Sequence, residues 1–108
     1  MAKYNMVVQS KAVADRDDDY NHWYDSQHFH DICAIPGVTG GRRLEQTMTV
    51  AGEPGLKYLA IYDIETDDIG ALMAEMGRRG AAGMMPISDA LDAPASVLWV
   101  YKVSDGYQ

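Results

Sequence analysis

The sequence has a single cysteine, Cys33, and little positive charge, because 9 lysines and arginines stand against 16 aspartates and glutamates for a net charge of −7. One cysteine cannot form an internal disulfide, which agrees with a reducing compartment. No basic run is longer than the pairs Arg42-Arg43 and Arg78-Arg79. The basic footprint that phosphate binding needs is therefore absent, and nucleic acid is not an expected partner.

Long apolar runs are also missing. No stretch approaches the ~20 residues of a membrane span, and residues 1–11 have the pattern of a first strand rather than of a signal peptide. The acidic balance also disfavours an anionic membrane surface, so we expect a cytoplasmic protein with no membrane partner. The 108 residues contain no linker-like stretch and predict one globular domain over 1–108. A chain of this size buries only about two thirds of its unfolded surface, so self-association would add useful burial.

The sequence does contain a regular succession of strand-like and helix-like segments. Period-2 alternation predicts four strands, and 3.6-residue spacing of apolar residues predicts two helices between them. The turn 51–55, with two glycines and a proline, favours an antiparallel hairpin. This β-α-β-β-α-β order is typical of a ferredoxin-like α+β sandwich with a four-stranded antiparallel sheet. In chain order the predicted strands are 4–10, 38–50, 56–65 and 96–104, and the helices are 18–35 and 67–79.

Apolar side chains occupy both faces of the last two predicted strands. In 96–104, the residues Val97, Trp99, Tyr101 and Val103 alternate with Leu98 and Val100. Two helices can cover only one face of the sheet, and a large exposed apolar patch usually marks an interface. We therefore expect a homodimer formed sheet to sheet.

The segment 21–43 holds all three histidines, the cysteine and one of the two tryptophans. Its helical part ends at Pro36 and Gly37, because proline cannot continue the hydrogen-bond ladder. Phe29, Ile32 and Cys33 point away from the main face, so the helix is predicted to have apolar contacts on more than one side. At 100° per residue that main face combines tyrosines, a histidine and a carboxylate with aliphatic residues. Its members are Tyr20, Tyr24, Gln27, His28, Asp31 and Ile35.

His28 is the strongest candidate for chemistry on this helix. A histidine takes and returns protons near neutral pH, and His28 lies one turn from Tyr24 and Asp31. Asp31 is expected to orient the imidazole, although a purely structural pair of His28 and Asp31 is the alternative. His28 and His30 point about 200° apart on a helix, so they cannot chelate one ion, and no metal or other cofactor is expected. His22 and His30 are expected in solvent or at an interface.

Several of these residues resemble a known family pattern. They match W-Y-x-x-x-H…D…x-P-G-[FV]…R-[RW], which is found in small EthD-like proteins of the dimeric α/β-barrel superfamily. That superfamily also contains muconolactone isomerases, polyketide cyclases and cofactor-free quinone-forming monooxygenases. The resemblance implies a pocket between the sheet and its two helices, with His28 facing it, and a dimer that closes two sheets into a barrel. His30 departs from the pattern, since such sequences often have a proline there. The matching residues are Trp23, Tyr24, His28, Asp31, the run Ile35-Pro36-Gly37-Val38 and the run Arg42-Arg43-Leu44.

Aromatic side chains with polar tips are candidates to line that pocket and would suit an aromatic or polyketide-like ligand. Ordinary core packing explains most of them equally well. Arg42 and Arg43 occupy opposite faces of their strand, so one of them can reach a carboxylate in the pocket. We place Arg42 in the substrate-binding set and Arg43 at the interface or in solvent. The aromatic candidates are Tyr20, Tyr24, Tyr58, Tyr62, Trp99 and Tyr101.

Three functions fit these features. The first is a cofactor-free lyase, isomerase or cyclase that acts on an aromatic or conjugated carbonyl metabolite. In it His28 transfers a proton, Asp31 orients His28, and Tyr24 together with one of the strand tyrosines polarises a substrate oxygen. The second is a cofactor-independent monooxygenase whose deprotonated phenolic substrate activates oxygen. The third is a dimer that binds a ligand without converting it.

Overall fold

The computed structural model describes residues 1–104, which form one sheet and a layer of helices. The strands of the sheet arise where side chains alternate between a buried and an exposed face. In chain order the elements are β1 (Ala2–Ser10), α1 (Asp17–Trp23), η1 (Tyr24–His28), α2 (Phe29–Cys33), β2 (Val38–Glu45), β3 (Tyr58–Thr66), α3 (Ile69–Ala81), η2 (Ala93–Ala95) and β4 (Val97–Lys102).

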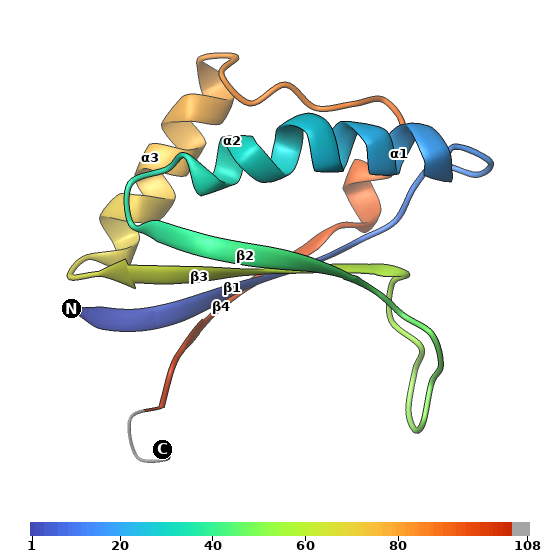
Figure 1. Cartoon of the computed structure of the whole chain (residues 1–108), viewed down its shortest axis with the longest axis horizontal. Helices are drawn as coiled ribbons and strands as arrows, with labels where there is room; N and C mark the ends of the chain where they lie inside the picture. Colours follow the sequence, from blue (N-terminus) through green and yellow to red (C-terminus); the bar gives the residue numbers. More distant parts are fainter. Residues whose placement is uncertain (105–108) are drawn as a thin grey trace.

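The four strands lie in the order β2-β3-β1-β4, and every neighbouring pair is antiparallel. All the helices lie over the same face of the sheet, with α1, η1 and α2 running end to end across it (Figure 1). This two-layer arrangement confirms the predicted ferredoxin-like α+β fold. Within residues 1–104, no helix is long and apolar enough to cross a membrane.

In the hairpin formed by β2 and β3, the strands are shorter and the connecting loop is longer than the sequence predicts. β2 ends at Glu45 rather than at residue 50, and β3 begins only at Tyr58. Gly52 and Gly55 both have positive φ, which suits a loop and not a paired strand. The loop 46–57 projects past the sheet on the side away from the helices (Figure 1).

The core lies between the helices and the covered face of the sheet. On β3 every second residue from Tyr58 to Ile64 is at most 4% exposed, and Met6 and Ser10 of β1 are buried beside that row. Aromatic residues of the first helical segments pack onto it, so the core is unusually rich in tyrosine. The buried β3 residues are Tyr58, Ala60, Tyr62 and Ile64, and the helical ones include Tyr20, Trp23, Tyr24, Ile32, Ile35 and Leu72.

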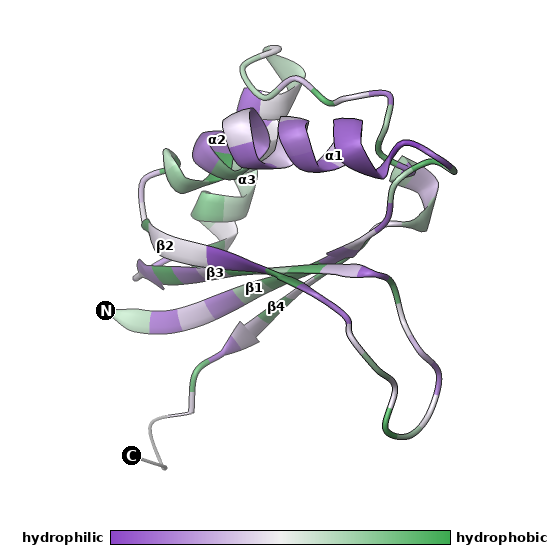
Figure 2. Cartoon of the chain, turned by 45° about the vertical axis from the view of Figure 1, so that its right-hand side comes forward, coloured by the Kyte–Doolittle hydropathy of each residue, from purple (hydrophilic) through white to green (hydrophobic). Residues whose placement is uncertain are grey.

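In the described part of the chain, no helix lies over the opposite face of the sheet (Figure 1). The strand registers align Arg42, Ile61, Val7 and Trp99 in one row across this face. Trp99 and Tyr101 are 42% and 56% exposed. Figure 2 shows apolar and polar stretches alternating along the strands that form it. Apolar side chains therefore lie uncovered on a face that also carries charge.

Gly37 fixes the turn that leads from the helical layer into β2. Its φ is +100°, and an added Cβ would lie 2.7 Å from Cδ1 of Leu72 in α3.

We expect Gly37→Ala to lower the free energy of unfolding by about 1–3 kcal/mol, because the residue would be strained in φ and would clash with a core leucine. Urea denaturation measures the loss. Gly77→Ala in α3 is the matched control: nothing lies within 4 Å of its Cβ position, so it should be neutral or stabilising, and equal losses at both positions would show that the turn does not depend on Gly37.

Candidate active site

A π-helical turn places His28. The backbone N–H of Phe29 donates to the carbonyl of Tyr24, five residues earlier, so η1 takes in one residue more than an α-helical turn. Beyond this turn the buried face moves by one position: Ile32 is 3% exposed, whereas Asp31 is only half-buried. The regular helical wheel was therefore wrong in pointing Ile32 away from the main face, and also in placing Gln27, which is exposed, on that face. Turns of this kind are frequent at functional sites.

His28 is held between two aromatic rings. Its imidazole stacks on the indole of Trp23, with 4.5 Å between centroids and 23° between planes. It also meets the ring of Tyr24 edge-on, at 4.9 Å and 90°. Its Nδ1 atom is buried and has no hydrogen-bond partner among the described residues. Burial lowers the pKa of His28 below its ordinary value of 6.5, Asp31 acts in the opposite direction, and Arg43 adds to the lowering.

Asp31 does not hold His28 as predicted. Among the described residues, no hydrogen bond or ion pair joins the two, and the Oδ2 atom of Asp31 is buried without a partner. Asp31 therefore acts on the imidazole through its charge alone.

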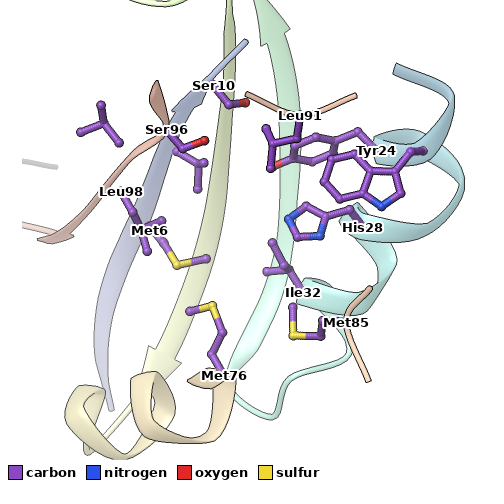
Figure 3. A pocket seen from close by; sticks show the side chains of 13 residues that line it. Met6, Ser10, Tyr24, His28, Ile32, Met76, Met85, Leu91, Ser96 and Leu98 are labelled. Atoms are coloured by element: carbon purple, nitrogen blue, oxygen red, sulfur yellow. The ribbon is translucent and has the colours of Figure 1, made fainter. Parts of the chain in front are cut away.

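A cavity of about 220 Å³ opens beside His28, between the helices and the sheet. Figure 3 shows the imidazole on one wall, with Met6 and Leu98 opposite and Met76 and Met85 at one end. Leu98 is 51% exposed, so the cavity reaches the surface at the β4 edge. The lining is mostly apolar and, within the described residues, includes no aspartate, glutamate, lysine or arginine. Its members are Met6, Val8, Ser10, Trp23, Tyr24, His28, Ile32, Met76, Met85, Leu91, Ser96, Val97 and Leu98.

Two of the predicted aromatic residues meet at the base of the site. The hydroxyls of Tyr24 and Tyr62 form a buried hydrogen bond of 2.8 Å. Burial raises the pKa of Tyr24 to about 12 and also raises the pKa of Tyr62. Both phenols therefore stay protonated at neutral pH and can donate a hydrogen bond. Tyr24 lines the cavity, whereas Tyr62 does not line it and supports Tyr24 from β3, so the predicted contact of Tyr62 with a ligand is corrected.

Two further predicted tyrosines lie beside this site rather than in it. The hydroxyl of Tyr20 hydrogen-bonds to Ser10. The hydroxyl of Tyr58 donates to Asp17 over 2.6 Å and accepts a bond from Asn21. The two rings stack on each other with centroids 4.8 Å apart. Neither tyrosine lines the cavity, so their predicted contact with a ligand is corrected: both pack in the core next to it.

Trp99 and Arg42 lie on the uncovered face of the sheet, away from the cavity. In the register, Trp99 is opposite Val7, and Arg42 is opposite Ile61. Neither lines the cavity beside His28, so placing them in that pocket was a wrong assignment of strand faces. The arginine of the covered face is Arg43, which had been expected at the interface or in solvent.

Several wall residues were not among the predicted site residues, and Trp23 is the most important of them. Trp23 stacks on His28 and donates from its indole Nε1 to the carbonyl of Pro86 over 3.1 Å, which ties the segment after α3 to the helix. Its place in the W-Y-x-x-x-H pattern was the available signal. Met76 and Met85 line the cavity, as the default role of methionine in filling irregular space suggests.

Metal ligation has little support in the described part of the chain. Within residues 1–104, no three histidine, cysteine or carboxylate side chains lie close enough together to hold a metal ion. His22 and His30 are exposed, on a different side of the helix from His28.

Cys33 is half-buried, and burial raises the pKa of its thiol, which does not favour a nucleophilic thiolate.

The lowered pKa of His28 predicts how stability depends on pH. The folded state binds fewer protons at this site than the unfolded chain does, so stability falls as the pH drops below about 6.5. We expect His28→Gln to remove this part of the acid dependence, as measured by urea denaturation between pH 5 and 8. His22→Gln, at an exposed position, should keep it. An unchanged acid dependence in His28→Gln would show that His28 titrates normally.

Comparison with known proteins relates the fold to two solved structures. No protein-family model and no curated protein matches the sequence. A protein described as a "putative monooxygenase" from Shewanella loihica PV-4 is 14% identical, with 95% of each chain covered and a TM-score of 0.64. An ethyl tert-butyl ether D (EthD) family protein from Bacillus halodurans C-125 is 12% identical, with 94% of this chain and 99% of that chain covered and a TM-score of 0.63. At the level of fold, the resemblance to EthD-like proteins that residues 23–44 predicted is therefore confirmed.

Proposed function

We propose that this protein is a small cytoplasmic enzyme in which His28 transfers a proton to and from a carbonyl-containing substrate, without a cofactor. The observation that carries this proposal is a half-buried imidazole on the wall of an apolar cavity, with a buried Nδ1 that accepts or donates no hydrogen bond within residues 1–104. A lowered pKa keeps the imidazole neutral at physiological pH and able to accept a proton. Lyase, isomerase and cyclase reactions all use such a step.

The cavity supports an aromatic or conjugated substrate. Its volume of about 220 Å³ suits one ring with a few substituents, since an apolar cavity of ~150 Å³ binds benzene. Trp23 and His28 both line the cavity, and a cavity without a charged lining residue favours a neutral ligand. His28 would then face the polar group of the ligand.

Three side chains would share the work. His28 takes a proton from the carbon next to the carbonyl and returns it elsewhere. The charge of Asp31 stabilises the protonated imidazole that forms in between. Tyr24, protonated at neutral pH, donates to the substrate oxygen as negative charge develops there. For this role its hydroxyl has to accept from Tyr62 while it donates, and either oxygen of that pair can be the donor.

Hydrogen–deuterium exchange tests the proton transfer directly. We expect the protein to exchange the α-protons of some members of a panel of small aryl ketones and cyclic enones in D₂O, followed by ¹H NMR. His28→Gln should slow this exchange by ~10²–10⁴, the usual contribution of general acid–base catalysis. His30→Gln, at an exposed histidine two residues on, is the matched control and should exchange at the native rate.

Two outcomes would redirect the assignment. Native exchange rates in His28→Gln would remove His28 from the chemistry. Binding of panel members that broadens their NMR lines without any exchange would favour the third hypothesis, a ligand-binding or accessory protein.

A cofactor-independent monooxygenase is the second candidate, and the likeness in fold to a protein described as a monooxygenase favours it. In this reaction His28 would deprotonate a phenol, and the electron-rich phenolate would react with oxygen. An oxygen electrode separates the two candidates, because only the oxygenase consumes oxygen while small phenols turn over.

The uncovered sheet face supports a homodimer formed sheet to sheet. Trp99, Tyr101 and Val103 are each more than two fifths exposed there, and exposed apolar patches usually mark interfaces. β4 also lines the cavity mouth on its other face, so dimerisation would fix the strand beside the site.

We expect a dimer at micromolar concentration in sedimentation velocity, and Trp99→Glu should convert it to a monomer, because it places like charges at the centre of the patch. Ile87→Glu is the matched control: Ile87 is 57% exposed in the segment after α3, outside that face. A native monomer, or dissociation by both substitutions alike, would refute the sheet-to-sheet dimer.

A further inference from the structure

Arg43 is an arginine that β2 turns toward the helices, and its side chain is only 15% exposed. Its guanidinium carbon lies 4.2 Å from the centroid of the Tyr24 ring. The rings of Tyr20 and Tyr58 lie 5.5 and 5.7 Å from the same carbon. A cation over the faces of several aromatic rings is a favourable contact when it is shielded from water.

Two polar residues of the first helical segments hold this guanidinium in place. Its Nη1 donates to Asp25 over 2.6 Å, and its Nη2 donates to Asn21 over 2.9 Å. Asp25 is 67% exposed, so this ion pair is screened on one side and is not by itself a strong stabiliser. The ion pair with Asp25 nevertheless fixes the position of the Arg43 guanidinium beneath the helix.

Tyr24 lies between this charge and the candidate base. One contact of its ring is the Arg43 guanidinium, and another is the edge-on imidazole of His28 at 4.9 Å. The Tyr62 hydroxyl fixes the far end of the same ring. The tyrosine therefore cannot move without disturbing its contacts with the arginine and the histidine.

We propose that Arg43 is a positioning residue for the His28 site: clamped by Asn21 and Asp25, it holds Tyr24 against the imidazole and keeps a positive charge behind it, which favours the neutral base. As a role in catalysis this rests on the proposed function. The electrostatic effect on His28 does not, and it is measurable without a substrate.

Few other groups compete with Arg43 for influence on His28. Asp31 on its own helix favours the protonated imidazole, and Arg43 disfavours it. Tyr62 on β3 and Tyr24 stay uncharged at neutral pH, and burial keeps Cys33 protonated. Within residues 1–104, the remaining elements turn only uncharged side chains toward the cavity: Met6, Val8 and Ser10 from β1, Met76 from α3, Met85 and Leu91 after it, and Ser96, Val97 and Leu98 at β4.

NMR titration of the His28 ring protons tests this inference. The reference protein carries His22→Gln and His30→Gln, both at exposed positions, so that one histidine remains. Adding Arg43→Gln should raise the pKa of His28, because a neighbouring cation is lost, whereas Arg43→Lys should keep it near the reference value. Arg42→Gln is the matched control on the opposite face and should leave it unchanged.

A further variant covers the case in which Arg43→Gln fails to fold. Asp25→Asn removes only the exposed partner and leaves the Arg43 charge less neutralised, so it should lower the pKa of His28. The inference is overturned if Arg43→Gln or Asp25→Asn leaves the pKa of His28 unchanged, or if Arg42→Gln shifts it as much as Arg43→Gln does. In an active protein the acid limb of the pH profile of kcat/KM should move to higher pH in Arg43→Gln. If the pKa of His28 responds to Arg43 in a protein that shows no activity, the electrostatic effect of Arg43 on His28 is supported and the proposed proton-transfer reaction is refuted.

Discussion

The hydrogen bond from the Phe29 N–H to the Tyr24 carbonyl decides the arrangement of the whole site. By closing a wider turn, it lets Trp23, Tyr24 and His28 face the sheet together and then brings Ile32 under them. A regular α-helix would present Asp31 next in that row. Because of the wider turn, Ile32 and not the carboxylate of Asp31 lies in the cavity wall, so the imidazole has apolar surroundings.

Buried polar groups in this protein fall into two classes. The tyrosine hydroxyls are satisfied, since Tyr24 bonds to Tyr62 and Tyr20 bonds to Ser10. In the described chain, only Nδ1 of His28 and Oδ2 of Asp31 are buried side-chain atoms without a partner. An unmade bond of this kind costs about 1–3 kcal/mol. The fold therefore concentrates its unsatisfied polarity on one stretch of helix beside the cavity.

The order of elements and the fold were predictable from the sequence, because alternation and helical spacing are local patterns. The choice of His28 and Tyr24 was also accessible, since the W-Y-x-x-x-H spacing places them together in either kind of turn. The side of the sheet to which Arg42 and Trp99 point was not predictable. Alternation shows that Arg42 and Arg43 point to opposite sides, but which side meets the helices depends on pairing and on the irregularity between Val38 and Gly40. Nothing in the local sequence marks the π-turn.

The indole of Trp23 has a consequence for motion. Its N–H is bound to the Pro86 carbonyl, and its face is covered by the His28 ring. A movement of the chain around Pro86 would therefore also move the indole of Trp23 and displace it relative to the His28 ring. Trp99, the second indole, lies on the uncovered face of the sheet. In a protein without Trp99, the fluorescence of Trp23 would report on the position of the segment around Pro86 and on the imidazole stacked against the indole.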